Sequence, residues 1–351
     1  MLIAVLGTPT TFTYGGCAIV KAIAERAGGP HHQIAAIFVD DLRKAWADLP
    51  ERDGERQVII VSDLPSTPLL DLLRSSRIPM IAFLDDIEEI VSQVVAFRGM
   101  GVRPALRHTT QVLCAIDQIA EQGALRVTKA ETGRKLKWFI ETLCEFLELN
   151  ASPELFSGVM ADLGYAEPHA PTLADYVASQ PTRPAAAAQP DASDESLLRF
   201  IAKQYANIGS GAHVERIAWP TELFFQAEPR QDFLDGPTEL VGPARFLSYG
   251  PYLHLPKGAW IVTITIEVAE NFSGNHLLVD VAAGVVLAAW ETPLPVLGVF
   301  SFELAFQIVD PFVPVEIRSQ IMSGAIEGRL AMREVAFRRP PASPVSKQML
   351  P

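Results

Sequence analysis

The stretch at residues 58–97 is VIIVSDLPSTPLLDLLRSSRIPMIAFLDDIEEIVSQVVAF, and it decides the fold. It contains two short apolar runs, Val58 to Ser62 and Met80 to Leu84, and a helical pattern follows each run, at Thr67 to Ser75 and at Ile87 to Phe97. Continuous apolar strands that alternate with helices are typical of a parallel sheet covered on both faces. We therefore expect a three-layer α/β domain.

The same alternation extends on both sides of this stretch and predicts a domain over residues 1–165. Further strands are expected at Leu2 to Leu6 and Ile34 to Val39, and further helices at Gly15 to Ala27, Asp41 to Leu49, Thr109 to Gln122 and Gly133 to Leu147. Residues 166–194 are rich in Pro and Ala, a composition typical of an extended linker. A connecting helix is expected within 195–213, at Glu195 to Tyr205.

From residue 214 the apolar period changes to two. In Trp260 to Val268 and in Phe302 to Ile308, apolar residues alternate with polar ones. Strands with one wet face, separated by Gly and Pro, indicate an all-β antiparallel sandwich, which we expect over 214–340 with a flexible tail at 341–351. Trp260 is in phase with Val262 and Ile264, so we assign it to the core.

Composition excludes several classes of function. The 351 residues include 29 Lys and Arg against 41 Asp and Glu, a net charge of −12, so neither nucleic acid nor an anionic lipid surface is an expected partner. The three cysteines form no CxxC pair, and no metal site is expected. The start, MLIAVLGTP, lacks a basic segment and is interpreted as a buried strand. No apolar run is long enough for a membrane span, and a cytoplasmic location is expected.

Ligands of open parallel sheets bind at the carboxyl ends of the strands. The first strand is followed there by Gly7-Thr8-Pro9-Thr10-Thr11, a loop rich in hydroxyls that leads into a helix. Free N–H groups at a helix start favour an anion. The loop has no Lys or Arg and matches neither GxGxxG nor GxxxxGK[ST]. The alternative is a tight turn in which Gly and Thr serve geometry and capping.

Two loops and one helix of this half resemble the P-loop sulfotransferase family. Thr10, Thr11 and Phe12 correspond to the Thr-Thr-aromatic end of the family's first loop, and the stretch from Leu136 to Leu149 is similar to its late helix. Asp85 and Ser92 correspond to the Asp and Ser that serve the 3′-phosphate. The resemblance implies a P-loop fold, the cofactor 3′-phosphoadenosine-5′-phosphosulfate, and cofactor binding by Thr8, Thr10, Thr11, Asp85 and Ser92.

The sequence departs from this family where cations are needed. Gly7 stands where the loop Lys belongs, Leu84 stands where an Arg belongs, and Asp86 replaces a Pro. Sulfuryl transfer concentrates negative charge that preorganised donors must stabilise. We therefore expect a weakened or lost nucleotide site and assign no catalytic residue. Arg98, Arg103 and Arg107 could supply the missing positive charge from elsewhere in the fold. The candidate general bases are His31, His32 and His108.

The second half contains LSYGPYLHLPKGAW at 247–260 and SGAIEG at 323–328. This pairing resembles the carbohydrate-binding-like β-sandwich modules of bacterial cell-surface glycan enzymes. Sugars stack on aromatic rings and bind polar groups beside them. The candidate substrate-binding residues are Tyr249, Tyr252 and Trp290, with Asn271 and Asn275 beside them. The alternative is that the two tyrosines pack at a strand end.

Two hypotheses follow. The first is a divergent sulfotransferase-like, two-domain protein of bacterial cell-surface glycan (polysaccharide) biosynthesis or modification, with glycans or glycan-synthesis proteins as partners. The second is a non-catalytic glycan-binding or scaffold protein. A nucleotide-sugar glycosyltransferase is a third possibility, but Asp85-Asp86 is a weak substitute for a DxD metal motif. Hydrolase chemistry has no support because GxSxG is absent.

Overall fold

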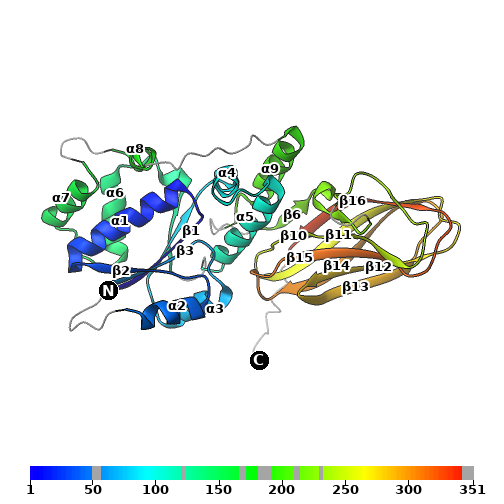
Figure 1. The fold of residues 1–351 in the computed structure, drawn as a ribbon, viewed down its shortest axis with the longest axis horizontal. Helices are drawn as coiled ribbons and strands as arrows, with labels where there is room; N and C mark the ends of the chain where they lie inside the picture. Colours follow the sequence, from blue (N-terminus) through cyan, green and yellow to red (C-terminus); the bar gives the residue numbers. More distant parts are fainter. Residues whose placement is uncertain are drawn as a thin grey trace, which may run out of the picture. The chain divides into compact units, whose positions relative to one another are not determined.

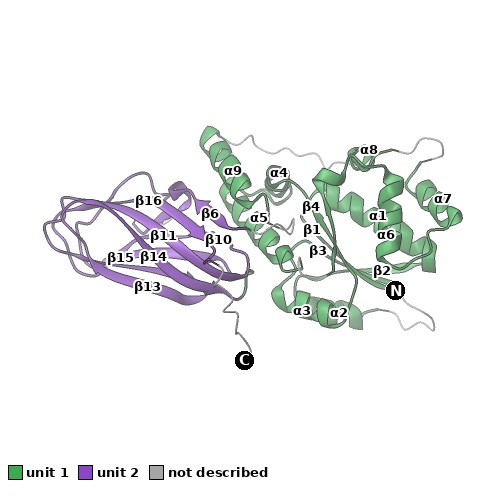
Figure 2. Ribbon diagram, turned by 180° about the vertical axis from the view of Figure 1, so that it is seen from behind, with its two compact units in different colours: residues 1–212, 310–312 green, residues 213–309, 313–351 purple. Residues whose placement is uncertain are grey.

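The computed structural model describes residues 1–49, 57–119, 123–165, 171–180, 191–208, 214–228 and 232–341. These residues form two compact units, shown in green and purple in Figure 2. Unit 1 comprises Met1–Ala212 with Asp310–Phe312, and unit 2 comprises His213–Val309 with Val313–Pro351. Each unit is described by itself. The predicted tail falls, from residue 342 on, outside the described residues.

Unit 1 contains a parallel five-stranded sheet in the order β2-β3-β1-β4-β5 (Figure 1). All four neighbouring pairs are parallel. Strand β4 is buried along its whole length, and β1 is buried from Ile3 to Gly7, because helices cover both faces. The strands are β1 Leu2–Gly7, β2 His31–Ala35, β3 Gln57–Ser62, β4 Met80–Leu84 and β5 Leu125–Thr128.

Helices lie on both faces of this sheet (Figure 1). On one face, α1, α6, α7 and α8 enclose a core with Phe83, Phe139 and Tyr176 at its centre. On the other face α5 packs on β1, and α4 and α9 pack on α5. The helices are α1 Thr11–Gly28, α2 Val39–Ala47, α3 Thr67–Ser75, α4 Ile87–Arg98, α5 Val102–Asp117, η1 Lys129–Glu131, α6 Leu136–Phe146, α7 Pro153–Asp162, α8 Leu173–Ser179 and α9 Ala192–Tyr205.

Two strands of unit 1 differ from the sequence prediction. Strand β5 was not expected. Strand β2 begins at His31 rather than Ile34, so His31 and His32 are strand residues and not part of a turn. His31 Nδ1 lies 2.9 Å from a carboxylate oxygen of Glu25, at the amino end of the sheet and away from the ligand-binding edge.

The stretch predicted as an extended linker contains a helix, and this corrects the prediction. Helix α8 begins after Thr172, whose hydroxyl accepts a hydrogen bond from the Asp175 N–H while the Asp175 carboxylate accepts one from the Thr172 N–H. Leu173 and Tyr176 are then buried against α1. Helix α9 begins at Ala192, within the predicted linker, and the compact unit extends to Ala212.

Unit 2 is a β-sandwich of two antiparallel sheets, as the period of two predicts. One sheet has the order β13-β12-β15-β9-β7, with β10 on β15, and the other has the order β14-β11-β16-β6, with β8 on β16. The inward set of β11 includes Trp260 and Val262, both buried, which confirms that Trp260 belongs to the core. The elements are β6 Arg216–Trp219, η2 Thr221–Leu223, β7 Phe225–Gln226, β8 Thr238–Glu239, β9 Arg245–Tyr249, β10 Pro251–Leu253, β11 Gly258–Ala269, β12 His276–Ala283, β13 Val285–Pro293, β14 Gly298–Ile308, β15 Val315–Ile321 and β16 Arg329–Arg338.

The register between β9 and β15 positions the aromatic candidates. Ser248 pairs with Ser319, both side chains are buried, and their hydroxyl oxygens lie 2.6 Å apart. Because successive side chains of a strand point to opposite faces, Tyr249 lies on the outer face of the sheet. The confirmed fold class is thus a parallel α/β unit followed by an antiparallel sandwich.

Candidate functional site

The first loop of unit 1 is short and its hydrogen bonds are mostly internal. Between β1 and α1 lie Thr8, Pro9 and Thr10. The Thr8 N–H donates to the Phe83 carbonyl (3.2 Å), and the Thr10 N–H donates to the Thr8 carbonyl (2.7 Å). The Thr10 hydroxyl accepts from the Thr13 N–H at 3.4 Å and so caps α1. Thr10 therefore has the capping role that was the alternative to cofactor binding.

Position 7 of the loop has no room for a side chain. A Cβ added to Gly7 would lie 2.5 Å from Thr13 Cγ2, 2.8 Å from Thr13 Oγ1 and 2.9 Å from the Phe83 carbonyl oxygen. Real Cβ atoms essentially never come within 3.0 Å of another atom. The lysine that the sulfotransferase pattern places here is therefore excluded by the packing of the loop.

Beside this loop is a hollow of about 450 Å³, which we call the loop hollow. The Arg98 guanidinium lies 3.2 Å from a carboxylate oxygen of Asp63, which follows β3. Of the three arginines proposed to compensate, Arg98 lines this hollow, whereas Arg103 lies 3.0 Å from Asp194 of α9. The loop hollow is lined by Pro9, Thr11, Tyr14, Asp63, Val94, Phe97, Arg98 and Gln180.

His108 of α5 lies within electrostatic range of this ion pair. Burial and, to a smaller extent, the positive charge of Arg98 lower its pKa to about 4, although the Asp63 carboxylate acts in the opposite direction. Its Nε2 atom is buried and has no hydrogen-bond partner among the described residues. The ring is thus neutral near pH 7 and a weak proton acceptor, which argues against the role of general base.

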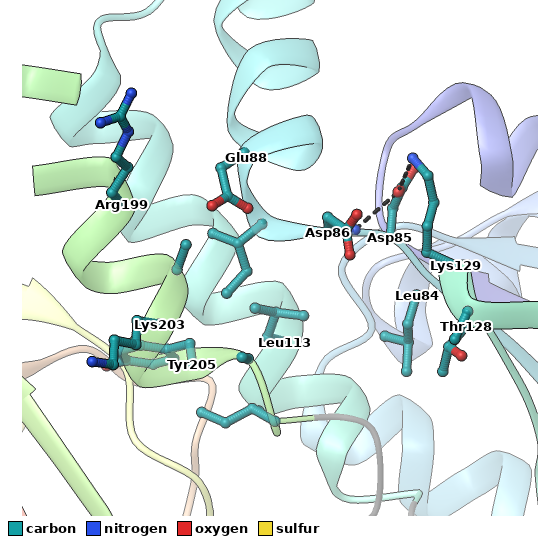
Figure 3. A pocket seen from close by; sticks show the side chains of 15 residues that line it. Leu84, Asp85, Asp86, Glu88, Leu113, Thr128, Lys129, Arg199, Lys203 and Tyr205 are labelled. Atoms are coloured by element: carbon teal, nitrogen blue, oxygen red, sulfur yellow. Dashed lines mark hydrogen bonds and ion pairs between the residues drawn. The ribbon is translucent and has the colours of Figure 1, made fainter. Parts of the chain in front are cut away.

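A second hollow, of about 480 Å³, opens at the ends of β4 and β5, and we call it the β4–β5 hollow (Figure 3). Here Lys129 donates a hydrogen bond of 2.8 Å to the Asp85 carboxylate, which also accepts the Asp86 N–H at 2.9 Å. Burial lowers the pKa of Lys129, but the hydrogen bond and negative charge of Asp85 outweigh it, so the pKa is raised. Arg199 and Lys203 of α9 also line this hollow, and their charged ends point away from Asp85.

The structure does not bring the five predicted cofactor-binding residues together. Thr11 lines the loop hollow and Asp85 lines the β4–β5 hollow. Thr8 is fully buried, Thr10 caps α1, and Ser92 is exposed on α4; none of the three lines either hollow. Of the five, only Thr11 and Asp85 therefore line one of these hollows, and the two hollows are different.

Two charged residues of these hollows were missed in the sequence. Asp63 follows the apolar run of β3 directly, just as Asp85 follows β4, so the expectation that ligands bind at the carboxyl ends of strands could have selected it. Lys129 follows β5, a strand that the sequence did not predict. Lys129 partly neutralises the acidic group at the end of β4.

Unit 2 has a hollow of about 590 Å³ on the outer face of its six-stranded sheet, which we call the sheet hollow. The Arg318 guanidinium donates two hydrogen bonds to the Asp280 carboxylate, at 2.7 and 3.0 Å. This bidentate pair fixes the guanidinium plane beside Tyr249. The sheet hollow is lined by Ala227, Glu228, Arg245, Phe246, Tyr249, Glu316 and Arg318.

An aromatic group supports Tyr249 from one side. The Phe225 ring stacks on it with centroids 5.3 Å apart, and Phe233 stacks on Phe225 at 4.9 Å. Tyr252 meets Tyr249 edge to face at 6.3 Å. The two tyrosines predicted to bind substrate therefore lie together. They also pack at the end of a strand, which was the alternative.

The other predicted substrate-binding residues lie elsewhere. The Trp290 ring stacks on Phe302 with centroids 4.3 Å apart, so that face of the indole is covered. Asn271 and Asn275 are buried: the Asn275 amide donates to Asn271 Oδ1 (3.0 Å), and the Asn271 amide donates to the Leu294 carbonyl (3.1 Å). The asparagines hold a turn together, and neither lines the sheet hollow.

Within the described ranges, no group of three His, Cys, Asp or Glu side chains is arranged to hold a metal ion. In the same part of the chain, every helix is too short or too polar to cross a membrane.

Comparisons with known proteins concern the fold. No family model matches the chain, and no curated protein matches it. Among solved structures, the chain is similar to mouse sulfotransferase SULT7A1 in complex with PAP (TM-score 0.41, 10% identity, 60% of this chain and 85% of that one).

Two further structures are also similar to the chain, one over a third of it and one over nearly all of it. One is the C-terminal CBM6 of LamC, a marine laminarinase from Zobellia galactanivorans (TM-score 0.20, 15% identity, 33% of this chain and 98% of that one). The other is the Gap123 glycosylation-associated protein complex from Streptococcus agalactiae (TM-score 0.20, 9% identity, 97% and 50%).

Proposed function

We propose that this chain is a glycan-binding protein that uses the sheet hollow of unit 2, and that its sulfotransferase-like unit no longer transfers sulfuryl groups. The observation that carries the proposal is Tyr249, whose ring lies in a hollow of about 590 Å³ beside the fixed Arg318–Asp280 pair. A hollow that combines an aromatic ring with a few oriented polar groups suits a sugar.

The roles of the side chains follow from their chemistry. The free side of the Tyr249 ring offers a surface for the C–H face of a pyranose, because Phe225 already supports its other side. Phe246, which is exposed on the same strand, extends the apolar surface. Arg318 donates to sugar hydroxyls and Glu316 accepts from them, so one hydroxyl pair can be held between two neighbouring groups of β15.

The balance of charge in the sheet hollow favours a neutral glycan. Arg245 and Arg318 contribute two positive charges, and Glu228 and Glu316 contribute two negative ones. Arg318 is further neutralised by Asp280. A polyanion such as a sulfated or uronic acid chain would find no net positive charge here, so uncharged sugars are the proposed class.

Around the first loop, the described residues of unit 1 lack the unpaired positive groups that sulfuryl transfer needs. Transfer from 3′-phosphoadenosine-5′-phosphosulfate requires positive groups at the phosphate and sulfuryl oxygens. The first loop has none, position 7 admits no side chain, and Arg98 and Lys129 are each paired with a carboxylate in separate hollows. We derive no catalytic step from this arrangement.

For the cellular role, we propose bacterial cell-surface glycan biosynthesis or modification in the cytoplasm, with glycans or glycan-synthesis proteins as partners. The combination of a sulfotransferase-like fold with a sandwich that carries a sugar-sized hollow supports this assignment.

The test is glycan-array screening followed by calorimetric titration of the full chain with the best neutral oligosaccharide. Tyr249→Ala is expected to weaken binding by about tenfold or more, which is about 1.4 kcal/mol. The matched control is Phe272→Ala, an exposed aromatic residue of unit 2 that does not line the sheet hollow, and it should bind as the wild type does. Absence of any glycan binding, or unchanged binding by Tyr249→Ala, would contradict the proposal.

One observation favours a second candidate function: Arg98 and Thr11 line the same hollow. In this alternative, the chain transfers sulfuryl groups and Arg98 supplies the positive charge that the loop lysine supplies in sulfotransferases. Titration with 3′-phosphoadenosine 5′-phosphate tests it, because a ligand of the folded state raises the melting temperature. Under our proposal the melting temperature stays unchanged at millimolar ligand. A rise that is lost in Arg98→Ala would favour the second candidate.

A further inference from the structure

Unit 1 has a further hollow, of about 330 Å³, at the amino end of its sheet, and we call it the amino-end hollow. It lies where α3 and α6 end and where β4 and β5 begin, so it is at the edge of the sheet opposite to the β4–β5 hollow. A volume of about 300 Å³ or more is enough for a small organic ligand. The lining of the amino-end hollow includes Arg74, Arg77, Ile78, Pro79, Met80 and Phe146.

Four of these side chains give the amino-end hollow an apolar surface. Met80 is buried at the start of β4, and Ile78, Pro79 and Phe146 are half-buried. The Pro79 carbonyl accepts a hydrogen bond of 2.9 Å from the Ala4 N–H, so this surface is held to β1 in the centre of the sheet. Apolar surface of this kind favours contact with the hydrocarbon part of a ligand, because both are then removed from water.

The charged side chains of the amino-end hollow are two arginines, and no described carboxylate lines it. The Arg74 guanidinium donates a hydrogen bond of 2.6 Å to the Asp71 carboxylate, but its buried Nε atom has no hydrogen-bond partner in the described part of the chain. The exposed side chain of Arg77 forms no ion pair or hydrogen bond with any described residue. Since Asp71 balances only one of the two positive charges, the hollow attracts an anion.

The backbone of Arg77 has a conformation that glycine usually adopts. Its φ of 53° lies in the left-handed region, two residues after α3 ends, and the next N–H, of Ile78, donates to the Leu73 carbonyl at 3.0 Å. Glycine is the usual residue at this position of a helix end. The same motif follows α7 at Gly164 and α6 at Glu148. The end of α3 therefore does not need an arginine, and this arginine lines a hollow at the cost of backbone strain.

We propose that the amino-end hollow binds a small organic anion with an apolar body, its oxyanion being a carboxylate or a phosphate monoester. The guanidinium groups of Arg74 and Arg77 hold the oxyanion, because a planar guanidinium donates paired hydrogen bonds to carboxylate and phosphate oxygens alike. The apolar surface contacts the body of the ligand. The amino-end hollow belongs to unit 1 and the sheet hollow to unit 2, so this inference does not depend on the proposed glycan binding.

The test is calorimetric titration of the full chain, at low salt, with phenyl phosphate and with benzoate. We expect at least one of these anions to bind with a dissociation constant of about 1 mM or below, and the tighter one identifies the oxyanion. Benzyl alcohol lacks the charge and inorganic phosphate lacks the apolar body, so each should bind about tenfold more weakly or not at all.

The decisive variant is Arg77→Gly, because glycine suits the left-handed backbone and the change removes only the side chain. This variant should melt at the same temperature as the wild type or higher, and its affinity for the anion should fall by about tenfold or more. The matched control is Arg43→Ala, which removes an exposed arginine of α2 that does not line the amino-end hollow. It lowers the net charge by the same amount and should bind the anion as the wild type does.

The inference would be overturned if neither anion bound the wild type at about 10 mM, or if Arg77→Gly kept the affinity of the wild type. Equal binding of benzyl alcohol or of inorganic phosphate would also overturn it. Binding that is lost in Arg98→Ala but kept in Arg77→Gly would assign the anion to the loop hollow instead. If Arg77→Gly fails to fold, Arg77→Asn decides, since asparagine also tolerates the left-handed conformation.

Discussion

Restoring the lysine of the sulfotransferase pattern at position 7 should damage the protein rather than activate it. We consider Gly7→Ala first, because it adds a single carbon atom. That carbon would lie 2.5 Å from Thr13 Cγ2 and 2.9 Å from the Phe83 carbonyl oxygen. Thr13 can rotate or shift, but the Phe83 carbonyl belongs to β4 in the centre of the sheet and cannot.

The magnitude follows from the cost of overpacking, about 1–3 kcal/mol. In a unit of about 200 residues each kcal/mol lowers the melting temperature by about 2–4 °C, so the expected loss is about 2–12 °C. Gly7→Lys should lower the melting temperature by at least as much. Gly7→Ala combined with Thr13→Ala should recover part of the loss but not all of it, because the carbonyl oxygen remains.

The assay is differential scanning calorimetry of the full chain, with Gly133→Ala as the control. Gly133 has ordinary backbone angles and no neighbouring atom within 4 Å of an added Cβ, so its variant should melt as the wild type does. The reasoning would be refuted if Gly7→Ala were as stable as the wild type. It would equally be refuted if Gly7→Lys folded and bound 3′-phosphoadenosine 5′-phosphate.

Three further predictions concern buried charge. Because burial lowers the pKa of His108 from 6.5 to about 4, the unfolded chain binds the extra proton between these values. The free energy of unfolding should therefore fall by about 3 kcal/mol as the pH drops from 6.5 towards 4. Urea unfolding at several pH values should show that this free energy depends less on pH in His108→Gln than in the wild type. Lys129→Met leaves the buried Asp85 carboxylate without its cation and should cost about 1–3 kcal/mol at pH 7 in the same assay; a combined Asp85→Asn change should recover part of this. Asp280→Asn removes the bidentate partner of Arg318 and should weaken glycan binding by about tenfold, or about 1.4 kcal/mol, in calorimetric titration, whereas unchanged affinity would argue against a fixed guanidinium.

The fold could be predicted where burial shows directly in the sequence. Strands β3 and β4 are nearly continuous apolar runs because helices cover both faces, and β11 alternates because one face is wet. Strand β5 escaped prediction because it is an edge strand of four residues with Arg126 in its middle. Missing that strand also hid Lys129, which follows it.

Helix α8 shows where local composition misleads. The prolines around it indicate an extended chain, yet Thr172 and Asp175 form a capping box that could have been recognised. The energetic reason for the helix is the burial of Leu173 and Tyr176 against α1, which depends on contacts far apart in the sequence.

The candidate sites were harder to predict than the fold, since a residue type does not reveal what covers it. Tyr249 lies in a hollow, whereas Trp290 has one ring face covered by Phe302. Asn271 and Asn275 bond to each other and to a turn. The sequence pattern of aromatic and amide residues does not show which side chains stay accessible, because the residues that pack on them come from other strands.

Ser248, whose hydroxyl contacts that of Ser319 in β15, lies one residue before Tyr249 in β9. Side chains alternate between the faces of a strand, so sliding β9 by one position would turn the tyrosine inward and expose a serine instead. The contact between the two hydroxyls thus fixes the register of β9, and this register places the Tyr249 ring on the face of the sheet that is exposed to solvent. The affinity of the sheet hollow for a glycan would then depend on buried atoms that do not contact the glycan, and substitutions in the core could change it.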